Sequence, residues 1–411
     1  MRLTFFRVII FIILLGIQYY FYRRVKRYCT SRSLSLFIIY CARILFITMN
    51  IPVALMLFLR LSSTAISHWI LYGVVYPTFL WHGTLIVLFV TIMILYTIKL
   101  PLSFSLWLGK KIPVFRVIID TLTKKDSYQQ FDASRRKFLQ NGMITLSGVA
   151  FAGASYGAFA RDNYEIITEK LFIKNLPPAF HNFTITLISD IHSSIFMPKE
   201  DMKRYAAAVN DVRSDMIVVT GDFVNSMEEE VYPFAEAFVD LNAQYGVFGC
   251  LGNHDYFANV NVVAKEVNQC GIRLLRNERI ALEKNGEKIY LLGVDDFGKK
   301  VTATERFSQL VHNTESTIPK ILLCHRPYFF EEASLNNIDV TLSGHTHGGQ
   351  VVFAKIGRTI ITPALVASPY VWGLYKKNNA QMYVNRGLGT VAMPIRVNCP
   401  PEITKLTLLP A

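Results

Sequence analysis

The sequence Leu-Ser-Gly-His-Thr-His-Gly-Gly-Gln occupies residues 342–350 and begins at the end of a short apolar run. It sets His345 and His347 two positions apart, among glycines that let the backbone bend tightly. In an extended or turning segment, side chains at i and i+2 can reach into one pocket. Because neutral imidazole is the commonest protein ligand for metals, the stretch predicts a metal site. A coincidental pair of surface histidines is the alternative.

Short apolar runs of β-strand type continue upstream of this stretch and alternate with helical stretches. This alternation predicts an α/β domain with a mostly covered sheet. Each run ends in polar residues, and α/β sheets place their sites at the carboxyl ends of strands. The runs are Phe183–Ser189, Met216–Thr220, Val247–Leu251, Ile289–Val294, Ile321–Cys324 and Val340–Ser343, with helical stretches such as Lys199–Val212 and Glu229–Leu241.

The polar residues after these runs are of the types that bind metals. Each one alone also has a structural explanation, because an aspartate after a strand often caps a turn or helix. Six such clusters, each at a strand end, argue against coincidence and favour one shared site. The residues are Asp190, His192, Asp222, Asn253, His254, Asp255, Asp295, Asp296 and His325, in addition to His345 and His347.

Together these clusters resemble the calcineurin-like metallophosphoesterase superfamily, over about Thr184–Leu408. The superfamily pattern is Asp-x-His, Gly-Asp, Gly-Asn-His-Asp/Glu, a later His and Gly-His-x-His, and every part is present. The resemblance implies a four-layer α-β-β-α sandwich and a centre of two metal ions. One ion would take Asp190, His192 and His347, the other Asn253, His325 and His345, and Asp222 would bridge them.

The resemblance also implies the chemistry of the centre. Carboxylate, amide and imidazole ligands suit two divalent ions of Mn, Fe or Zn. Such a pair can clamp the attacking and leaving oxygens of a phosphate ester and activate a water, so no protein nucleophile is needed. His254 would donate to the phosphate and protonate the leaving oxygen, and Asp255 would hold the His254 ring and fix its tautomer.

The first part of the chain has a different composition. Of the 411 residues, 52% are hydrophobic, and the net charge is +13. Residues 1–161 carry 19 basic and 3 acidic side chains, whereas residues 162–411 carry 24 and 27. The basic excess therefore belongs to the first part. The balanced second part lacks the basic surface that a phosphate backbone requires, which argues against a nuclease.

Four apolar segments in residues 1–161 predict membrane-spanning helices, over 3–22, 36–59, 69–98 and 142–160. A basic connector, 99–141, precedes the fourth segment and ends in Ser134-Arg135-Arg136-Lys137-Phe138-Leu139, which resembles a twin-arginine export signal. Two motifs near the end of the chain, Asn385–Gly389 and Cys399–Ile403, resemble those of a bacterial, membrane-associated branch of the superfamily. Several members of that branch carry a twin-arginine-like segment. A fourth span with basic flanks is the plainer reading of the same residues.

The positive-inside rule then sets the topology. The loop after the first span and the connector are both strongly basic, so both are expected in the cytoplasm. An even number of spans places the phosphoesterase domain, residues 162–411, on the non-cytoplasmic side of the cell membrane.

The sequence thus predicts a membrane-anchored phosphoesterase that acts on a phosphate ester or pyrophosphate. A position beside the bilayer favours a lipid-linked or envelope substrate. The alternative is a membrane sensor or scaffold whose phosphoesterase-like domain binds a ligand without turnover. The complete set of seven metal-ligand residues argues for the enzyme.

Overall fold

The computed structural model describes residues 2–59, 67–124, 163–296, 300–357 and 359–411, together with scattered positions between 134 and 157. The chain divides into two compact units. The first consists of Met1–Leu59 and Tyr72–Tyr156, and the second of Arg60–Leu71 and Gly157–Ala411. We call them the helical unit and the catalytic unit, and each is described by itself.

The helical unit contains three segments that are long and apolar enough to cross a membrane: Arg7–Ser31, Leu36–Phe58 and Leu71–Gly109. They agree with the first three predicted spans, although the third helix continues past Pro101 to Gly109. Of the fourth predicted span, 142–160, ten positions are described and all of them are helical, whereas the twin-arginine-like segment lies outside the described residues except for Ser134. The elements in this part of the chain are α1 (Arg2–Ser31), α2 (Leu36–Thr48), α3 (Ile51–Leu59), α4 (His68–Ile70), the π-helical turn η2 (Leu71–Val75), α5 (Tyr76–Gly109) and α6 (Pro113–Lys124). Of these, α4 and Leu71 belong to the second unit.

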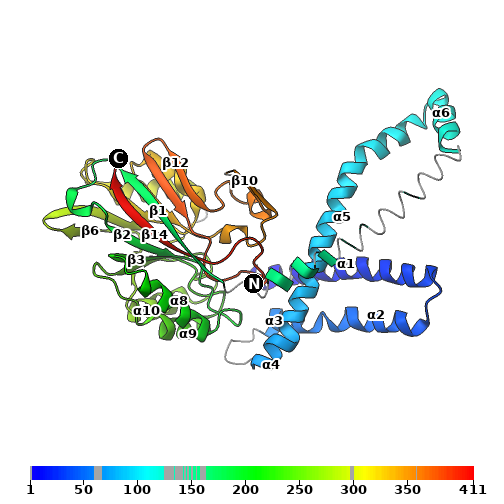
Figure 1. Cartoon of the computed structure of the whole chain (residues 1–411), viewed down its shortest axis with the longest axis horizontal. Coiled ribbons are helices and arrows are strands. Elements are labelled where there is room, and N and C mark those ends of the chain that lie inside the picture. Colours follow the sequence, from blue (N-terminus) through cyan, green and yellow to red (C-terminus); the bar gives the residue numbers. More distant parts are fainter. Residues whose placement is uncertain are drawn as a thin grey trace. The chain divides into compact units, whose positions relative to one another are not determined.

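The catalytic unit is built on two mixed six-stranded sheets, and Figure 1 shows their strands side by side. The first sheet has the order β1-β14-β2-β3-β4-β5, and the second has the order β12-β13-β9-β8-β7-β6. The first contains β1 (Glu165–Ile173), β2 (Thr184–Ile188), β3 (Met216–Thr220), β4 (Val247–Cys250), β5 (Arg273–Leu274) and β14 (Glu402–Pro410). The second contains β6 (Glu278–Lys284), β7 (Glu287–Gly293), β8 (Lys320–Leu323), β9 (Val340–Ser343), β12 (Gly373–Lys377) and β13 (Ala380–Val384).

Helices cover the outer face of each sheet. Figure 1 shows α8, α9 and α10 together on one side of the first sheet. These are α8 (Lys199–Asp211), α9 (Val231–Phe238) and α10 (Val260–Gln269), and the second sheet carries α11 (Lys300–Val311) and α12 (Phe330–Leu335). The short turns are η3 (Pro178–Phe180), η4 (Glu228–Glu230), η5 (Pro327–Phe329), η6 (His347–Gly349) and η7 (Pro363–Val366), and a separate hairpin pairs β10 (Ala354–Ile356) with β11 (Thr359–Ile361).

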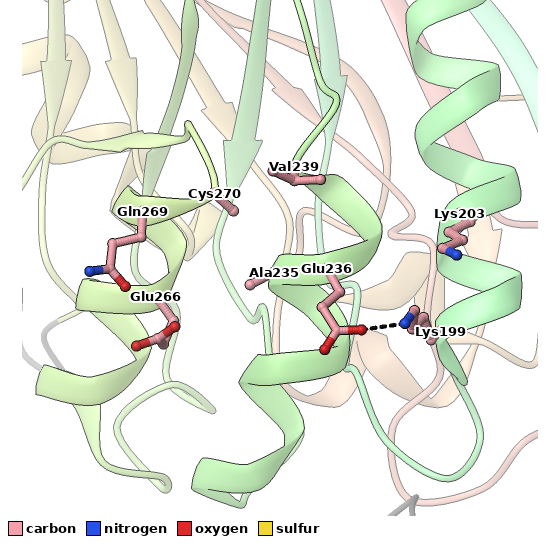
Figure 2. A pocket seen from close by; sticks show the side chains of 8 residues that line it. All are labelled: Lys199, Lys203, Ala235, Glu236, Val239, Glu266, Gln269 and Cys270. Atoms are coloured by element: carbon pink, nitrogen blue, oxygen red, sulfur yellow. Dashed lines mark hydrogen bonds and ion pairs between the residues drawn. The ribbon is translucent and has the colours of Figure 1, made fainter.

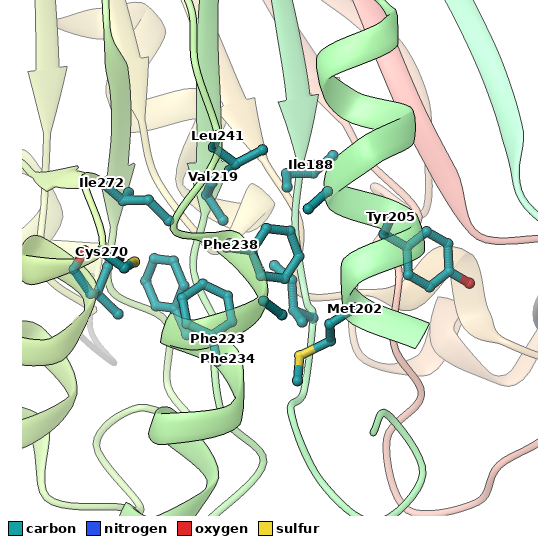
Figure 3. Close-up of a cluster of buried hydrophobic side chains, with 14 of the residues drawn as sticks. Ile188, Met202, Tyr205, Val219, Phe223, Phe234, Phe238, Leu241, Cys270 and Ile272 are labelled. Carbon is teal, nitrogen blue, oxygen red and sulfur yellow. Dashed lines mark hydrogen bonds between the residues drawn. The ribbon is translucent and has the colours of Figure 1, made fainter. Parts of the chain in front are cut away.

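Three buried apolar clusters define the layers. One lies between the two sheets and includes Leu187 from the first and Leu342 from the second. Another joins the second sheet to α11 and α12. The third joins the first sheet to α8, α9 and α10 (Figure 3). The layers therefore run helix, sheet, sheet, helix, which confirms the predicted α-β-β-α sandwich.

The third cluster also fixes the loop that follows β3. Phe223 comes directly after Asp222 and is fully buried. Its ring lies 5.2 Å from that of Phe234, which in turn stacks on Phe238 at 4.8 Å (Figure 3). Burying an aromatic side chain of this size stabilises a fold by about 2–3 kcal/mol. The packing of Phe223 therefore holds the neighbouring Asp222 at the strand end.

Outside this core, α8, α9 and α10 form a surface groove of about 470 Å³ (Figure 2). Lys199 of α8 pairs with Glu236 of α9 at its rim. Both side chains are exposed, so the pair contributes little to stability. None of the nine predicted site residues lines this groove.

Candidate metal centre

The predicted metal ligands lie at the ends of strands from both sheets. Asp190, Asp222 and Asn253 follow β2, β3 and β4 of the first sheet. His325 follows β8, and His345 and His347 follow β9, in the second sheet. The carboxyl ends of these strands meet at one rim, because the two sheets pack face to face. Seven side chains that span 158 positions of the sequence are thereby brought together.

The first group consists of Asp190, His192 and His347, whose ligand atoms lie within 4.8 Å of one another. His192 Nε2 lies 3.0 Å from His347 Nε2, and His347 Nε2 lies 3.5 Å from Asp190 Oδ1. All three residues are buried. Burial, and then the nearby His254, lower the pKa of His192 to about 3, so its ring is neutral. Neutral ring nitrogens that converge beside a carboxylate fit a divalent cation.

The second group is formed by Asp222, His325 and His345, with ligand atoms again within 4.8 Å of one another. His345 Nδ1 lies 3.1 Å from His325 Nε2, and Asn253 Oδ1 lies 3.2 Å from the same nitrogen. The Nδ1 of His325 donates to Thr220 O at 2.7 Å. That bond places a proton on Nδ1 and directs Nε2 toward the group.

Asp222 belongs to both groups. Its Oδ2 lies 3.4 Å from His192 Nε2 and 3.2 Å from His325 Nε2. Burial opposes ionisation of the carboxyl, but the positive His325 ring holds the pKa of Asp222 well below its usual value. Burial alone would lower the pKa of His325, and Asp222 instead raises it to about 10. The Asp222 carboxyl is therefore ionised and is available as a ligand for a cation.

The backbone at these positions is unusual. Asp190, His192, Asp222, His345 and His347 all have positive φ angles, between 48° and 72°. This region is sparsely populated for residues other than glycine and costs about 1–3 kcal/mol each. Such strain is typical of functional sites, where the surrounding structure holds a residue in a required direction.

Two glycines are required by close packing at the rim. A Cβ at Gly344 would lie 1.9 Å from Ser189 Oγ and 2.2 Å from Asp190 Oδ2. A Cβ at Gly252 would lie 2.2 Å from Asp222 Oδ1. The glycines of Gly-His-Thr-His and Gly-Asn-His-Asp therefore let the strand ends of the two sheets approach the buried carboxylates.

His254 lies beside both groups. Its ring packs against that of His192, with centroids 4.5 Å apart. A ring nitrogen of His254 lies within 4.8 Å of a ring nitrogen of His192 and of a carboxylate oxygen of Asp222. Its Nδ1 donates to the main-chain oxygen of Asn225 at 2.5 Å. This bond fixes the proton on Nδ1 and leaves Nε2 for the centre.

Asp255 has a different partner from the one predicted. The sequence suggested that it holds the His254 ring, but its carboxylate accepts hydrogen bonds from backbone amides. The amides are those of Asp222, Phe223, Val224 and Gly252, at 2.8–3.3 Å. The turn buries Asp255 beside backbone amides that need an acceptor, whereas His254 stays partly exposed. Asp255 is a positioning residue, and Asn225 holds the ring.

Asp295 and Asp296, which follow β7, do not join the centre. Asp295 Oδ2 accepts from Arg276 Nη2 at 2.9 Å, and Asp296 Oδ2 accepts from Arg326 Nη2 at 2.8 Å. Both carboxylates are thus used in arginine pairs at the edge of the second sheet.

Arg396 supports the rim and was missed in the sequence. It is buried, and its guanidinium donates to the main-chain oxygens of Arg386 at 3.0 Å and Gly387 at 3.1 Å. It also reaches His347 O at 3.5 Å, and Gly389, another of its acceptors, donates its N–H to Asp190 O at 2.7 Å. A single charge inside the apolar segment Val391–Val397 was the signal that could have indicated this role.

Comparisons with known proteins agree with this geometry. The family model for calcineurin-like phosphoesterases matches residues 183–349. The metallophosphoesterase YkuE of Bacillus subtilis is 32% identical over 286 residues, which cover 67% of this chain and 97% of YkuE. Phosphodiesterase YaeI of Escherichia coli is 27% identical over 283 residues, 67% of this chain and 99% of YaeI.

A third relative combines the two kinds of unit. A transmembrane protein with metallophosphoesterase domain from Danio rerio is 27% identical over 255 residues, 59% of this chain and 57% of that protein. In this chain, three helices are long and apolar enough to cross a membrane. With the matching family model and the similarity to YkuE, the chain belongs to the calcineurin-like phosphoesterases, metal-dependent enzymes that hydrolyse phosphate esters.

Proposed function

We propose that the chain is a membrane-anchored phosphoesterase that uses two divalent cations. In this assignment Asp190, His192 and His347 hold one ion, and Asn253, His325 and His345 hold the other. Asp222 bridges the two ions.

The observation that supports two ions rather than one is the position of Asp222 Oδ2. This single oxygen lies 3.4 Å from a ring nitrogen of the first group and 3.2 Å from one of the second. A carboxylate shared in this way suits a bridging ligand between two cations. The remaining oxygen, Oδ1, accepts from the backbone N–H of His254 at 2.8 Å, which keeps the carboxylate from rotating.

The donor set indicates which metals fit. Carboxylate, amide and imidazole donors favour Mn, Fe or Zn, and the six cysteines are absent from the metal-ligand groups among the described residues. When bound, such ions supply an activated water and neutralise charge on the phosphate oxygens. The buried carboxylates of Asp190 and Asp222 neutralise part of the cationic charge, so that a phosphate ester can both bind and leave.

His254 completes the reaction in this proposal. Asn225 O holds its Nδ1–H, so a protonated ring presents its Nε2–H to the leaving oxygen of the ester. Asp255 keeps the loops after β3 and β4 together through four backbone amides, and so keeps His254 beside Asp222. In this proposal, seven residues bind the metal ions, His254 transfers the proton and Asp255 positions His254.

We assign residues 1–161 to the membrane region and residues 162–411 to the catalytic domain. The basic cytoplasmic loops and four spans, including 142–160, would place the catalytic domain on the non-cytoplasmic side. A centre held there beside a bilayer favours lipid-linked or envelope phosphates. A reporter that functions only in the cytoplasm should be silent when fused to Ala411, and an active fusion would reject this topology.

The decisive experiment uses the full-length protein in detergent. Phosphomonoesters, phosphodiesters and pyrophosphates, each in soluble and lipid-linked form, are assayed with Mn, Fe and Zn. We expect turnover that depends on added metal, with two ions per chain by elemental analysis and fewer in Asp222→Ala. One ion per chain in the wild type, or an unchanged metal content in the variant, would reject the dinuclear assignment.

A further inference from the structure

The region around β10, β11 and η7 exposes a continuous set of large apolar side chains. We call residues 353–366 the apolar arm. Val366 is 95% exposed, Ile356 is 67% exposed and Phe353 is 60% exposed. Ile361 and Leu365 are exposed as well. Monomeric soluble proteins rarely expose apolar residues in such groups, and those that do commonly use them for binding.

The arm cannot bury these side chains against its own fold. β10 and β11 pair only with each other, in an antiparallel hairpin, among the described residues. The opposite face is already used, because Ile360 packs with Val352, Val371 and Cys399 in a small buried cluster. Ile356 and Ile361 lie on the hairpin face opposite Ile360, and this second apolar face is exposed.

The charges in the arm's own sequence are basic, while the acidic Glu165 and Glu169 line a pocket together with Lys355. Between Val351 and Val371 the sequence contains Lys355 and Arg358 and no acidic residue. Lys355 is exposed, and its Nζ lies 5.6 Å from the ring centroid of Trp372, which is half-buried. Apolar side chains with basic and tryptophan neighbours match the boundary between anionic headgroups and acyl chains.

The base of the arm is joined to the loop that carries His347. Thr362 Oγ1 donates to Val351 O at 3.0 Å and lies 3.3 Å from Gly349 O. Gly349 is so close to Thr362 that a Cβ there would lie 2.0 Å from its hydroxyl. A surface that binds the arm is consequently also held close to the loop that carries His347.

We propose that the apolar arm docks on the anionic surface of the bilayer that anchors the chain. Phe353, Ile356 and Val366 enter the boundary between headgroups and acyl chains, and Lys355 binds lipid phosphates. The candidate spans keep that bilayer within reach of the arm at all times. This inference does not depend on catalysis, because membrane contact is measured without turnover.

The test measures the depth of a fluorescent probe at position 366. Full-length Val366→Cys is labelled in a Cys41→Ser background, since Cys41 is the exposed native cysteine. The protein is reconstituted into phosphatidylglycerol vesicles that contain lipids brominated on the acyl chain. The matched control is Leu335→Cys at the end of α12, where Leu335 is 77% exposed beside Glu331 and Glu332. We expect bromolipid quenching at position 366 to exceed that at position 335 by about threefold or more.

Two further results complete the test. Lys355→Gln should lower the ratio of docked to undocked arm by about fivefold, and vesicles of phosphatidylcholine alone should weaken quenching similarly. Equal quenching at positions 366 and 335 would overturn the proposal. Protection of the probe at position 366 from aqueous iodide without bromolipid quenching would also overturn it, because the occupant would then be a protein. An unchanged proteolysis pattern shows that each variant is folded.

Discussion

His254 is held in place by a main-chain oxygen rather than by a side chain. The Asn225 carbonyl fixes its Nδ1 proton, and the ring lies between the two groups of metal-ligand residues. A residue in this position can transfer a proton to the leaving oxygen without binding metal itself. Its importance should depend on how much help the leaving group needs.

We therefore predict that His254→Ala loses about 10²–10⁴-fold in kcat for an alkyl phosphodiester. A nitrophenyl ester, whose leaving group needs no proton, should lose about tenfold or less. Both substrates are assayed with the same enzyme preparation, and elemental analysis should give unchanged metal content. Equal losses for the two substrates would exclude the proton-transfer role.

The sequence predicted which side chains form the site, but not the main-chain groups that hydrogen-bond to them. Spacing and residue type were sufficient to select seven residues that converge at one rim, because strand ends of parallel sheets share an edge. The partner of His254 was not predictable, since any residue at position 225 offers the same carbonyl. Asp255 was assigned to the wrong partner for a related reason: the sequence does not indicate which backbone amides need an acceptor.

Glu230 supports the loop that presents the Asn225 carbonyl. Its buried Oε2 accepts from the N–H groups of Asn225, Ser226 and Met227, at 2.9, 2.7 and 3.0 Å. Burial raises the pKa of Glu230 from 4.5 to about 7, against the opposing effect of these amides. The folded state thus keeps a proton that the unfolded state has already lost between these pH values.

The sign of the resulting pH dependence follows directly. A carboxyl with a raised folded-state pKa lowers the free energy of unfolding as pH rises from about 4.5 to about 7, by roughly 3 kcal/mol at most. Glu230→Gln removes this titration. Its melting temperature relative to wild type should therefore increase between pH 5 and pH 8, as measured by proteolysis of the catalytic unit during heating. A difference that stays constant with pH would contradict the shift.

Among the elements, the helices of the helical unit are joined by a small cluster of buried polar side chains. Gln18 of α1 donates to Asn50 Oδ1 at 3.1 Å, and its Nε2 lies 2.8 Å from His82 Nε2 in α5. Trp81 Nε1 donates to Gln18 Oε1 at 3.1 Å. All three polar side chains of the set Gln18, Asn50 and His82 are buried.

Gln18→Leu should loosen this bundle, because it removes contacts to Asn50, His82 and Trp81 together. Hydrogen bonds between membrane helices contribute about 0.6 kcal/mol each on average, so we expect a loss of roughly 1–2 kcal/mol. Unfolding of the helical unit in detergent is followed by Trp81 fluorescence, with the exposed Tyr19→Leu as the control. Equal stabilities of the two variants would show that the polar group does not hold the helices.

The elements of the catalytic unit were predictable to different degrees. The runs at 216–220 and 340–343 agree with β3 and β9 residue for residue, because turn signals bound a continuous apolar segment. The pairing of β1 with β14 was not predictable. It joins Glu165–Ile173 to Glu402–Pro410 in parallel, across more than two hundred residues, and no local pattern records such a partner.

For the whole molecule, the two units should respond differently to removal of metal. The seven metal-ligand residues belong to the catalytic unit and come from both of its sheets. Ions that bind only the folded state stabilise it by about 2.7 kcal/mol at a hundredfold excess over Kd. Chelation should therefore lower the melting temperature of the catalytic unit and leave the helical unit unchanged.

Both transitions can be followed in one sample of the full-length protein. Proteolysis during heating reports on the catalytic unit, and Trp81 fluorescence reports on the helices. Activity should disappear with chelator and return with one or more of Mn, Fe and Zn. Identical melting of the catalytic unit with and without chelator would contradict a stabilising metal centre.

The distribution of the metal-ligand residues over two sheets has a consequence for the maturation of the protein. Neither sheet alone supplies a complete coordination sphere, and the bridging contacts exist only after the sheets have docked. Contacts between residues so distant in sequence form late in folding. If the proposed ligands hold the ions, a partly folded chain has no high-affinity site for an ion, and the metal is selected from the compartment in which folding finishes.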